Sequence, residues 1–197
     1  MSTNTKRIAH TMTDRQPHPP FEAWHWLRAD RRLNYPPHTL VEIGQTLTAT
    51  DAPLALCEYG LHWSLRPLDA LMCAPGPIVC RVRVSGDVVL GDSMGCSTER
   101  TVIVMADATE TLRAFARWSA LQVIHLWYAP DVVRQYLETG DESLRDAAWD
   151  AAWAATRAAA CAAAYDNGVL HAIRAAQNHE LERRLLKILE GSHVRYV

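Results

Sequence analysis

The sequence is organised around one stretch, LCEYGLHWSLRPLDAL, residues 56–71. It contains a glycine at Gly60, a histidine and a serine two positions apart at His62 and Ser64, and a proline at Pro67. Glycine permits tight backbone geometry before the histidine. Proline is tolerated in the first turn of a helix, where its missing N–H has no partner to lose. The stretch therefore predicts a strand-turn-helix corner that carries polar side chains.

Two interpretations of this corner follow from its side chains. In an extended backbone His62 and Ser64 point to one side while Trp63 points to the other. A histidine and a hydroxyl on one wall can hydrogen-bond a ribose or a phosphate, and the free amides of the helix just beyond favour an anion. In the alternative interpretation, His62 bonds a backbone carbonyl and Ser64 caps the helix. Only the first interpretation predicts a ligand.

The composition excludes several classes of protein. A chain of 197 residues is long enough for one full core, or for a small core with a helical appendage. Its net charge of −2 argues against bulk nucleic-acid binding. No apolar run approaches the roughly 18 residues that span a bilayer. Residues 1–20 lack the apolar core of a secretory signal. We therefore expect no membrane association and a cytoplasmic location.

The five cysteines form no Cys-x-x-Cys pair. This usage favours reduced thiols in a cytosolic protein. A zinc site built from Cys57, His62, Cys73 and Cys80 is the alternative, but its spacing matches no common ligand pattern. We therefore expect no metal site.

The first part of the chain predicts a leader followed by strands. Residues 1–20 are rich in Thr, Asn, His and Pro and have no periodicity, which predicts a disordered leader. In residues 21–27 an extended backbone places Trp24 and Trp26 on one face and His25 on the other. Residues 78–84 alternate as a half-buried strand does, and residues 101–105 are typical of a central strand. Residues 21–105 therefore predict a small mixed or antiparallel sheet domain with a short helix.

Residues 106–197 change to helical periodicity. Residues 147–164 are dominated by alanine, the best helix former, and their packing depends on Trp149, Trp153 and the following Tyr165. The last helix places Leu181, Leu185 and Leu189 on one stripe, typical of core or of a dimer seam. The fold class expected is thus α+β, with an all-helical C-terminal part packed against the sheet. A homodimer through the alanine faces is a further structural hypothesis.

Three segments of the sequence carry a resemblance to a known domain. The segments LCEYGLH (56–62), PLDAL (67–71) and VCRVRVSGDV (79–88) resemble an uncharacterised domain common in phage and prophage proteins. The resemblance covers roughly residues 38–105, and the alanine- and tryptophan-rich tail is similar to tails that accompany such domains. It implies a phage-type accessory protein in the host cytoplasm. Small phage proteins of this sort often inhibit a bacterial defence complex such as a CRISPR effector, so a non-catalytic, anti-CRISPR-type inhibitor that binds a host protein is one expected function.

The corner also resembles part of the ADP-ribosyltransferase fold, in which a His-x-Ser strand end followed by a helix cradles NAD. The resemblance implies NAD as cofactor and an NAD-binding or NAD-using domain that modifies a host target, with enzymatic activity left open. The catalytic residues it implies are His62, Ser64 and Glu99. The cofactor-binding residues it implies are His25, Gly60, Trp63 and Arg81. The family also uses a glutamate on a later strand, whereas the candidate here, Glu99, is expected in a loop.

Overall fold

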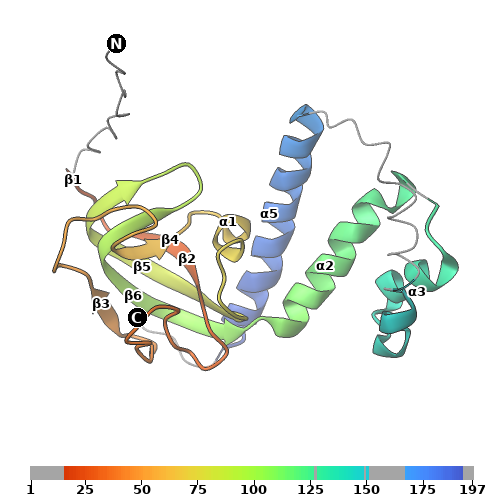
Figure 1. Cartoon of the computed structure of the whole chain (residues 1–197), viewed down its shortest axis with the longest axis horizontal. Helices are drawn as coiled ribbons and strands as arrows, with labels where there is room; N and C mark the ends of the chain where they lie inside the picture. The colour runs from red at the N-terminus through yellow and green to blue at the C-terminus, as the bar shows by residue number, and fades with distance from the viewer. Residues whose placement is uncertain (1–15, 127, 149, 151–166, 193–197) are drawn as a thin grey trace, which may run out of the picture.

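The computed structural model describes residues 16–126, 128–148, 150 and 167–192 (Figure 1). It is an α+β fold, as the sequence predicts, with an antiparallel sheet and a C-terminal part that is largely helical. Our predictions for Trp149, Trp153, Tyr165 and most of the alanine-rich segment lie outside the described residues. The strands are β1 (Gln16–Pro17), β2 (Phe21–Leu27), β3 (Thr46–Thr48), β4 (Leu61–Trp63), β5 (Ile78–Leu90) and β6 (Gly95–Asp107).

A long hairpin of β5 and β6 forms the centre of the sheet. β1 and β2 pair with β5, while β3 and β4 pair with β6, all antiparallel. Ser64, just after β4, bonds back to Trp24 in β2. The Trp24 amide donates to the Ser64 carbonyl at 2.9 Å, and the Ser64 amide donates to the Trp24 carbonyl at 3.0 Å. The sheet therefore curls until the end of β4 meets β2.

The hairpin corrects two sequence predictions. The Ser-Gly-Asp sequence at residues 85–87 predicts a turn, but β5 continues to Leu90 through a bulge between Ser85 and Val88. Gly86 supports this bulge with a φ of 74°. We also expected Glu99 in a loop, but β6 begins at Gly95 and carries Glu99 within it. The reason is the length of the hairpin: backbone pairing with β5 extends through polar residues that have no strand-like pattern of their own.

The sheet also begins earlier than we predicted. β1 (Gln16–Pro17) pairs with Val88 and Asp87 of β5, so part of the expected leader, residues 1–20, belongs to the sheet. Edge pairing is made by backbone N–H and C=O groups and needs no apolar periodicity. The sequence pattern therefore carried no signal for this short strand.

The helices are α1 (Pro67–Leu71), α2 (Thr109–Val123), α3 (Asp131–Thr139) and α5 (Asn167–Glu190), with short 3₁₀ turns at Ile124–Leu126 and Glu142–Leu144. In Figure 1, α5 (blue) stands against the sheet, and α2 (green) runs outward to α3. One buried cluster joins Trp24 and Trp26 of β2 to Leu181, Leu185 and Leu189 of α5. The leucine stripe is therefore core, and sheet and helices share it.

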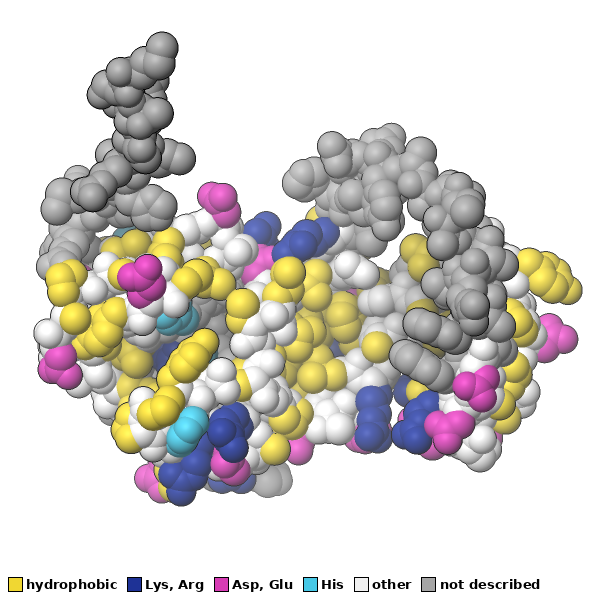
Figure 2. Space-filling model, viewed as in Figure 1, with side chains coloured by type: hydrophobic (Ala, Val, Ile, Leu, Met, Phe, Trp, Pro, Cys, Tyr) yellow, Lys and Arg dark blue, Asp and Glu magenta, His cyan; other side chains and the backbone are white. Residues whose placement is uncertain are grey.

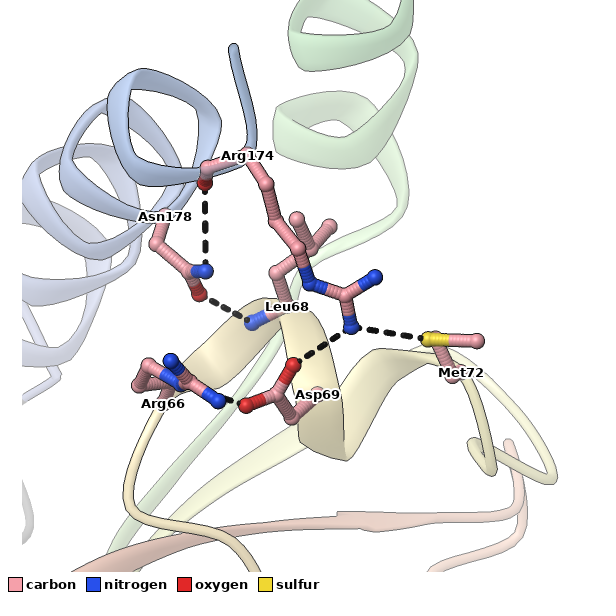
Figure 3. A network of polar contacts seen from close by, with 6 residues as sticks. All are labelled: Arg66, Leu68, Asp69, Met72, Arg174 and Asn178. Carbon is pink, nitrogen blue, oxygen red and sulfur yellow. Dashed lines mark hydrogen bonds and ion pairs between the residues drawn. The ribbon is translucent and has the colours of Figure 1, made fainter. Parts of the chain in front are cut away.

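Polar contacts around the buried carboxylate of Asp69 also join α5 to α1 (Figure 3). The carboxylate of Asp69, 1% exposed, accepts from Arg66 Nε at 2.5 Å and from Arg174 Nη2 at 2.7 Å. Asn178 Oδ1 accepts from the amide of Leu68 at 3.1 Å, and this amide belongs to the first turn of α1. Charge pairing and helix capping thus hold α5 on α1.

Candidate functional site

A cavity of about 340 Å³ lies between β2, the corner of residues 57–64, α1 and the loop at residues 33–36. Figure 2 shows histidine and basic side chains at the bottom of a recess among apolar ones, over the sheet half of the molecule. Aromatic and apolar groups make most of the wall, and a few polar groups converge on it, which is the usual composition of a small-molecule site. Its lining includes His25, Tyr35, Gly60, His62, Ser64 and Arg100.

The structure brings together most of the residues that the sequence predicted for a site. The cavity lining includes His25, Gly60, His62, Trp63 and Ser64. His25 comes from β2 and the others from the corner, so residues far apart in the chain share one wall. The corner therefore lines the cavity together with β2.

Two predicted residues do not line this cavity. Arg81 Nε donates to Glu22 Oε2 at 3.0 Å, and its guanidinium lies 4.7 Å from the Trp24 ring centroid. Glu99 Oε2 accepts a hydrogen bond from Ser85 Oγ at 2.8 Å, beside the bulge of β5. Both side chains have partners elsewhere, so neither joins His62 and Ser64.

The continuous apolar run at residues 54–57 predicts a short buried strand, but the structure has a backbone turn there, and this turn shapes the cavity. These residues form a turn, in which Ala55 bridges to Tyr59 and Cys57 takes a positive φ of 66°. A short apolar run does not specify a strand by itself. Gly60 has a φ of 124°, and a Cβ there would lie 2.8 Å from Leu54 Cδ2, so only glycine fits this turn without strain.

His62 serves this turn rather than presenting a free ring nitrogen. Its Nε2 accepts from the amide of Cys57 at 3.0 Å, so the neutral ring carries its proton on Nδ1. Burial, and then the charge of Arg100, lower the pKa of His62, while a hydrogen bond with the backbone of Gly60 acts in the opposite direction. The structure thus favours the interpretation in which His62 bonds backbone groups, and we assign it as a positioning residue.

Ser64 does not cap α1. The N-cap residue of that helix is Arg66, and no side-chain hydrogen bond caps it. Ser64 is buried and its backbone makes the bridge to Trp24. Its contribution to the cavity wall therefore comes from the curled sheet and not from the helix start.

The residue that sequence reasoning missed is Arg100. It lies on β6, is 2% exposed and lines the cavity. Its Nη1 donates to the carbonyl of His62 and to His25 Nδ1, the latter at 3.0 Å. Within the described part of the chain it forms no ion pair, and its buried Nε has no hydrogen-bond partner. An arginine two positions before the buried Val102 on one strand was the available signal.

The electrostatics around Arg100 show the cost of burying this cation. Burial lowers the pKa of Arg100 to about 10. Burial, and then the charge of Arg100, hold the pKa of His25 well below its usual 6.5. Both histidines are therefore neutral, and the cavity contains one positive charge with no carboxylate from the described residues to balance it. Such a site is suited to an anion.

The cysteines do not form a metal site in the described part of the chain. Cys57, Cys73, Cys80 and Cys96 are free thiols there. No group of three His, Cys, Asp or Glu side chains that could hold a metal ion occurs among the residues described. Burial raises the pKa of Cys80 to about 12, and the pKa of Cys96 is raised to about 11, mainly by burial.

Comparisons of the chain with known protein families, with curated proteins and with solved structures found no match. Among the helices described, none has both the length and the apolar character needed to cross a membrane.

Proposed function

We propose that this protein binds an anionic nucleotide of the NAD class in the cavity around Arg100, as a phage-type accessory protein with an ADP-ribosyltransferase-like domain. The observation that carries the proposal is Arg100 itself. A buried guanidinium costs free energy unless an anion pairs with it, and the described residues supply no such anion. Phosphate groups of a nucleotide would supply it.

The walls of the cavity support this ligand class. Tyr35 and Trp63 supply aromatic surface, while Ser64 and Asn34 add polar groups. Aromatic walls suit a base or a nicotinamide ring, and hydroxyl or amide groups suit a ribose. The geometry supports binding more than transfer chemistry, because the Glu99 carboxylate bonds Ser85 outside the cavity.

Titration calorimetry of the full chain with NAD and ADP-ribose tests the proposal. We expect binding heat with the wild type, a loss of it in Arg100→Gln, and no change in Arg81→Gln, whose side chain is paired with Glu22. Glu99→Gln should bind as the wild type does. An absence of heat with both ligands, or equal binding by Arg100→Gln, would contradict the proposal.

The alternative proposal is a non-catalytic inhibitor that binds a bacterial defence complex of the CRISPR type. One observation favours it: Leu65 and Leu90 are 60% and 53% exposed and line the same surface hollow. Exposed apolar groups that gather at a hollow are typical of protein-binding surfaces. The test is interference by a CRISPR effector in host cells. Leu65→Asp and Leu90→Asp should abolish inhibition, and Leu186→Asp, an exposed leucine on α5, should not.

A further inference from the structure

We infer that the nucleotide enters the cavity phosphate first, with one edge of the Arg100 guanidinium holding the phosphate and the ring of Tyr35 stacking on the base at the mouth. This inference rests on the proposed function for the ligand class and adds its orientation and two contact residues. Neither Arg100 nor Tyr35 belongs to the corner sequence of residues 56–71.

The hydrogen bonds of Arg100 select one edge of its guanidinium. An arginine has five N–H donors, two of them on Nη1. Nη1 donates to the carbonyl of His62 and to Nδ1 of His25, which accounts for both of its protons. The Nε–H is buried without a partner among the residues described, and the hydrogen bonds of the side chain come from Nη1 and not from Nη2. The Nε–H and the nearer of the two Nη2 protons are parallel. This pair of donors is the fork that binds two oxygens of a phosphate at once.

The neighbouring histidines do not compete for this role. His25 Nδ1 accepts a hydrogen bond from Arg100, and His62 Nε2 accepts one from the amide of Cys57. They hold the arginine side chain and the turn in place. The unoccupied Arg100 donors need an acceptor, and a phosphate provides negatively charged oxygens, which a base or a ribose does not.

Exposure distinguishes the two ends of the site. Arg100 is 2% exposed and Tyr35 is 78% exposed, yet both line the cavity. The phosphate therefore lies deep and the rest of the ligand points outward, past the loop that carries Tyr35. At about 340 Å³ the cavity is near the lower limit of ligand pockets, roughly 300 Å³, so it accommodates one mononucleotide unit. The second half of a dinucleotide would lie outside.

The test is calorimetry of the full chain with AMP, inorganic phosphate and adenosine at constant ionic strength. We expect AMP to bind most tightly, inorganic phosphate to bind more weakly, and adenosine to bind at least tenfold more weakly than AMP, on the order of one lost charged hydrogen bond. If adenosine binds as tightly as AMP, the phosphate is not held by Arg100 and the inference fails.

Two variants separate the contacts. Arg100→Lys keeps the charge but removes the fork, and we expect both AMP and phosphate to bind on the order of tenfold to a hundredfold more weakly. Tyr35→Ala should weaken the binding of AMP by about fivefold to a hundredfold and leave the binding of inorganic phosphate unchanged, because only the base stacks on the tyrosine ring. Arg81→Lys and Tyr128→Ala, a tyrosine that is 96% exposed, are the matched controls.

The outcomes distinguish this inference from the proposed function. If NAD and ADP-ribose bind but Arg100→Lys binds AMP as well as the wild type does, the orientation is wrong and the function stands. If phosphate and AMP bind through Arg100 but NAD does not, the phosphate site stands and the NAD class is wrong. Should Arg100→Lys fail to fold, the Tyr35→Ala comparison decides, and equal losses for AMP and phosphate overturn the inference.

Discussion

Asp69 and Arg100 are both charged side chains removed from water, but the fold treats them differently. Asp69 belongs to α1 and is paired with Arg66, next to the same helix, and with Arg174 of α5 (Figure 3). Arg100 lies in the curled sheet, hydrogen-bonded to neutral groups only. The paired carboxylate joins two helices, whereas the unpaired guanidinium faces a cavity. A buried charge with protein partners therefore stabilises the packing of elements, whereas one without them marks a candidate site for a ligand.

The largest effect should come from removing both cations that pair with Asp69, which leaves a buried charge without an ionic partner, as Arg100 is. In Arg66→Met/Arg174→Met the carboxylate, 1% exposed, loses both cations, and we expect a loss of about 3–5 kcal/mol of unfolding free energy. Urea unfolding measures it. The matched control adds Asp69→Asn to the same double variant. If this triple variant is no more stable than the double, the cost does not come from an unpaired charge.

The turn beside the cavity is stabilised by its backbone geometry, whereas the α1–α5 junction is stabilised by charge pairing. Gly60→Ala places a Cβ 2.8 Å from Leu54 Cδ2 and 3.0 Å from Cys96 Cβ at a φ of 124°, so we expect a loss of about 2 kcal/mol. Gly191→Ala is the control, because its nearest contacts, 3.6 and 3.8 Å, are ordinary. Equal stability of the two variants would show that the turn relaxes without cost.

The neutral histidine beside Arg100 makes stability depend on pH. The pKa of His25 is well below 6.5 in the folded state because of burial and Arg100. As pH falls below about 6.5, the unfolded chain takes up a proton that the folded chain does not, so stability falls.

Below about pH 6.5 we expect His25 to change the free energy of unfolding by up to about 1.4 kcal/mol per pH unit. Above about pH 7 we expect no contribution from it. His25→Asn, which keeps an acceptor for Arg100, should reduce the slope. His179→Asn, on the exposed side of α5, is the comparison variant. Urea unfolding between about pH 5 and about pH 7 measures both, and an unchanged slope in His25→Asn would refute the assignment.

The smallest effect on stability should come from removing the unpaired charge. Arg100→Met removes the hydrogen bonds to His62 and His25, which is unfavourable. It also removes the free-energy cost of burying a cation, a cost that is seen in the pKa of Arg100, which burial lowers to about 10. The two terms oppose each other, so we expect a change within about 1 kcal/mol in urea unfolding. A loss as large as that of the Asp69 double variant would mean that Arg100 is structural.

Local patterns explain which predictions succeeded. The α+β class, the face shared by Trp24 and Trp26, and the leucine stripe of α5 follow from periodicity alone. The corner at Gly60 and Pro67 follows from the backbone preferences of these two residues. The strand at residues 54–57 was wrong because four apolar residues do not distinguish a strand from a turn. Glu99 and β1 were misplaced because strand pairing extends beyond any side-chain pattern.

By itself, the sequence determined the elements and the corner that shapes the cavity, because side-chain period, glycine and proline act within a few residues of the chain. Only the tertiary structure decided that Arg100 and Tyr35 join this corner and that Glu99 and Arg81 do not. Which charges meet depends on how β6 pairs with β5 and how far the sheet curls. These long-range contacts also decide that Asp69 is paired with Arg174, 105 positions away, while Arg100 forms no ion pair with the residues that the structure describes.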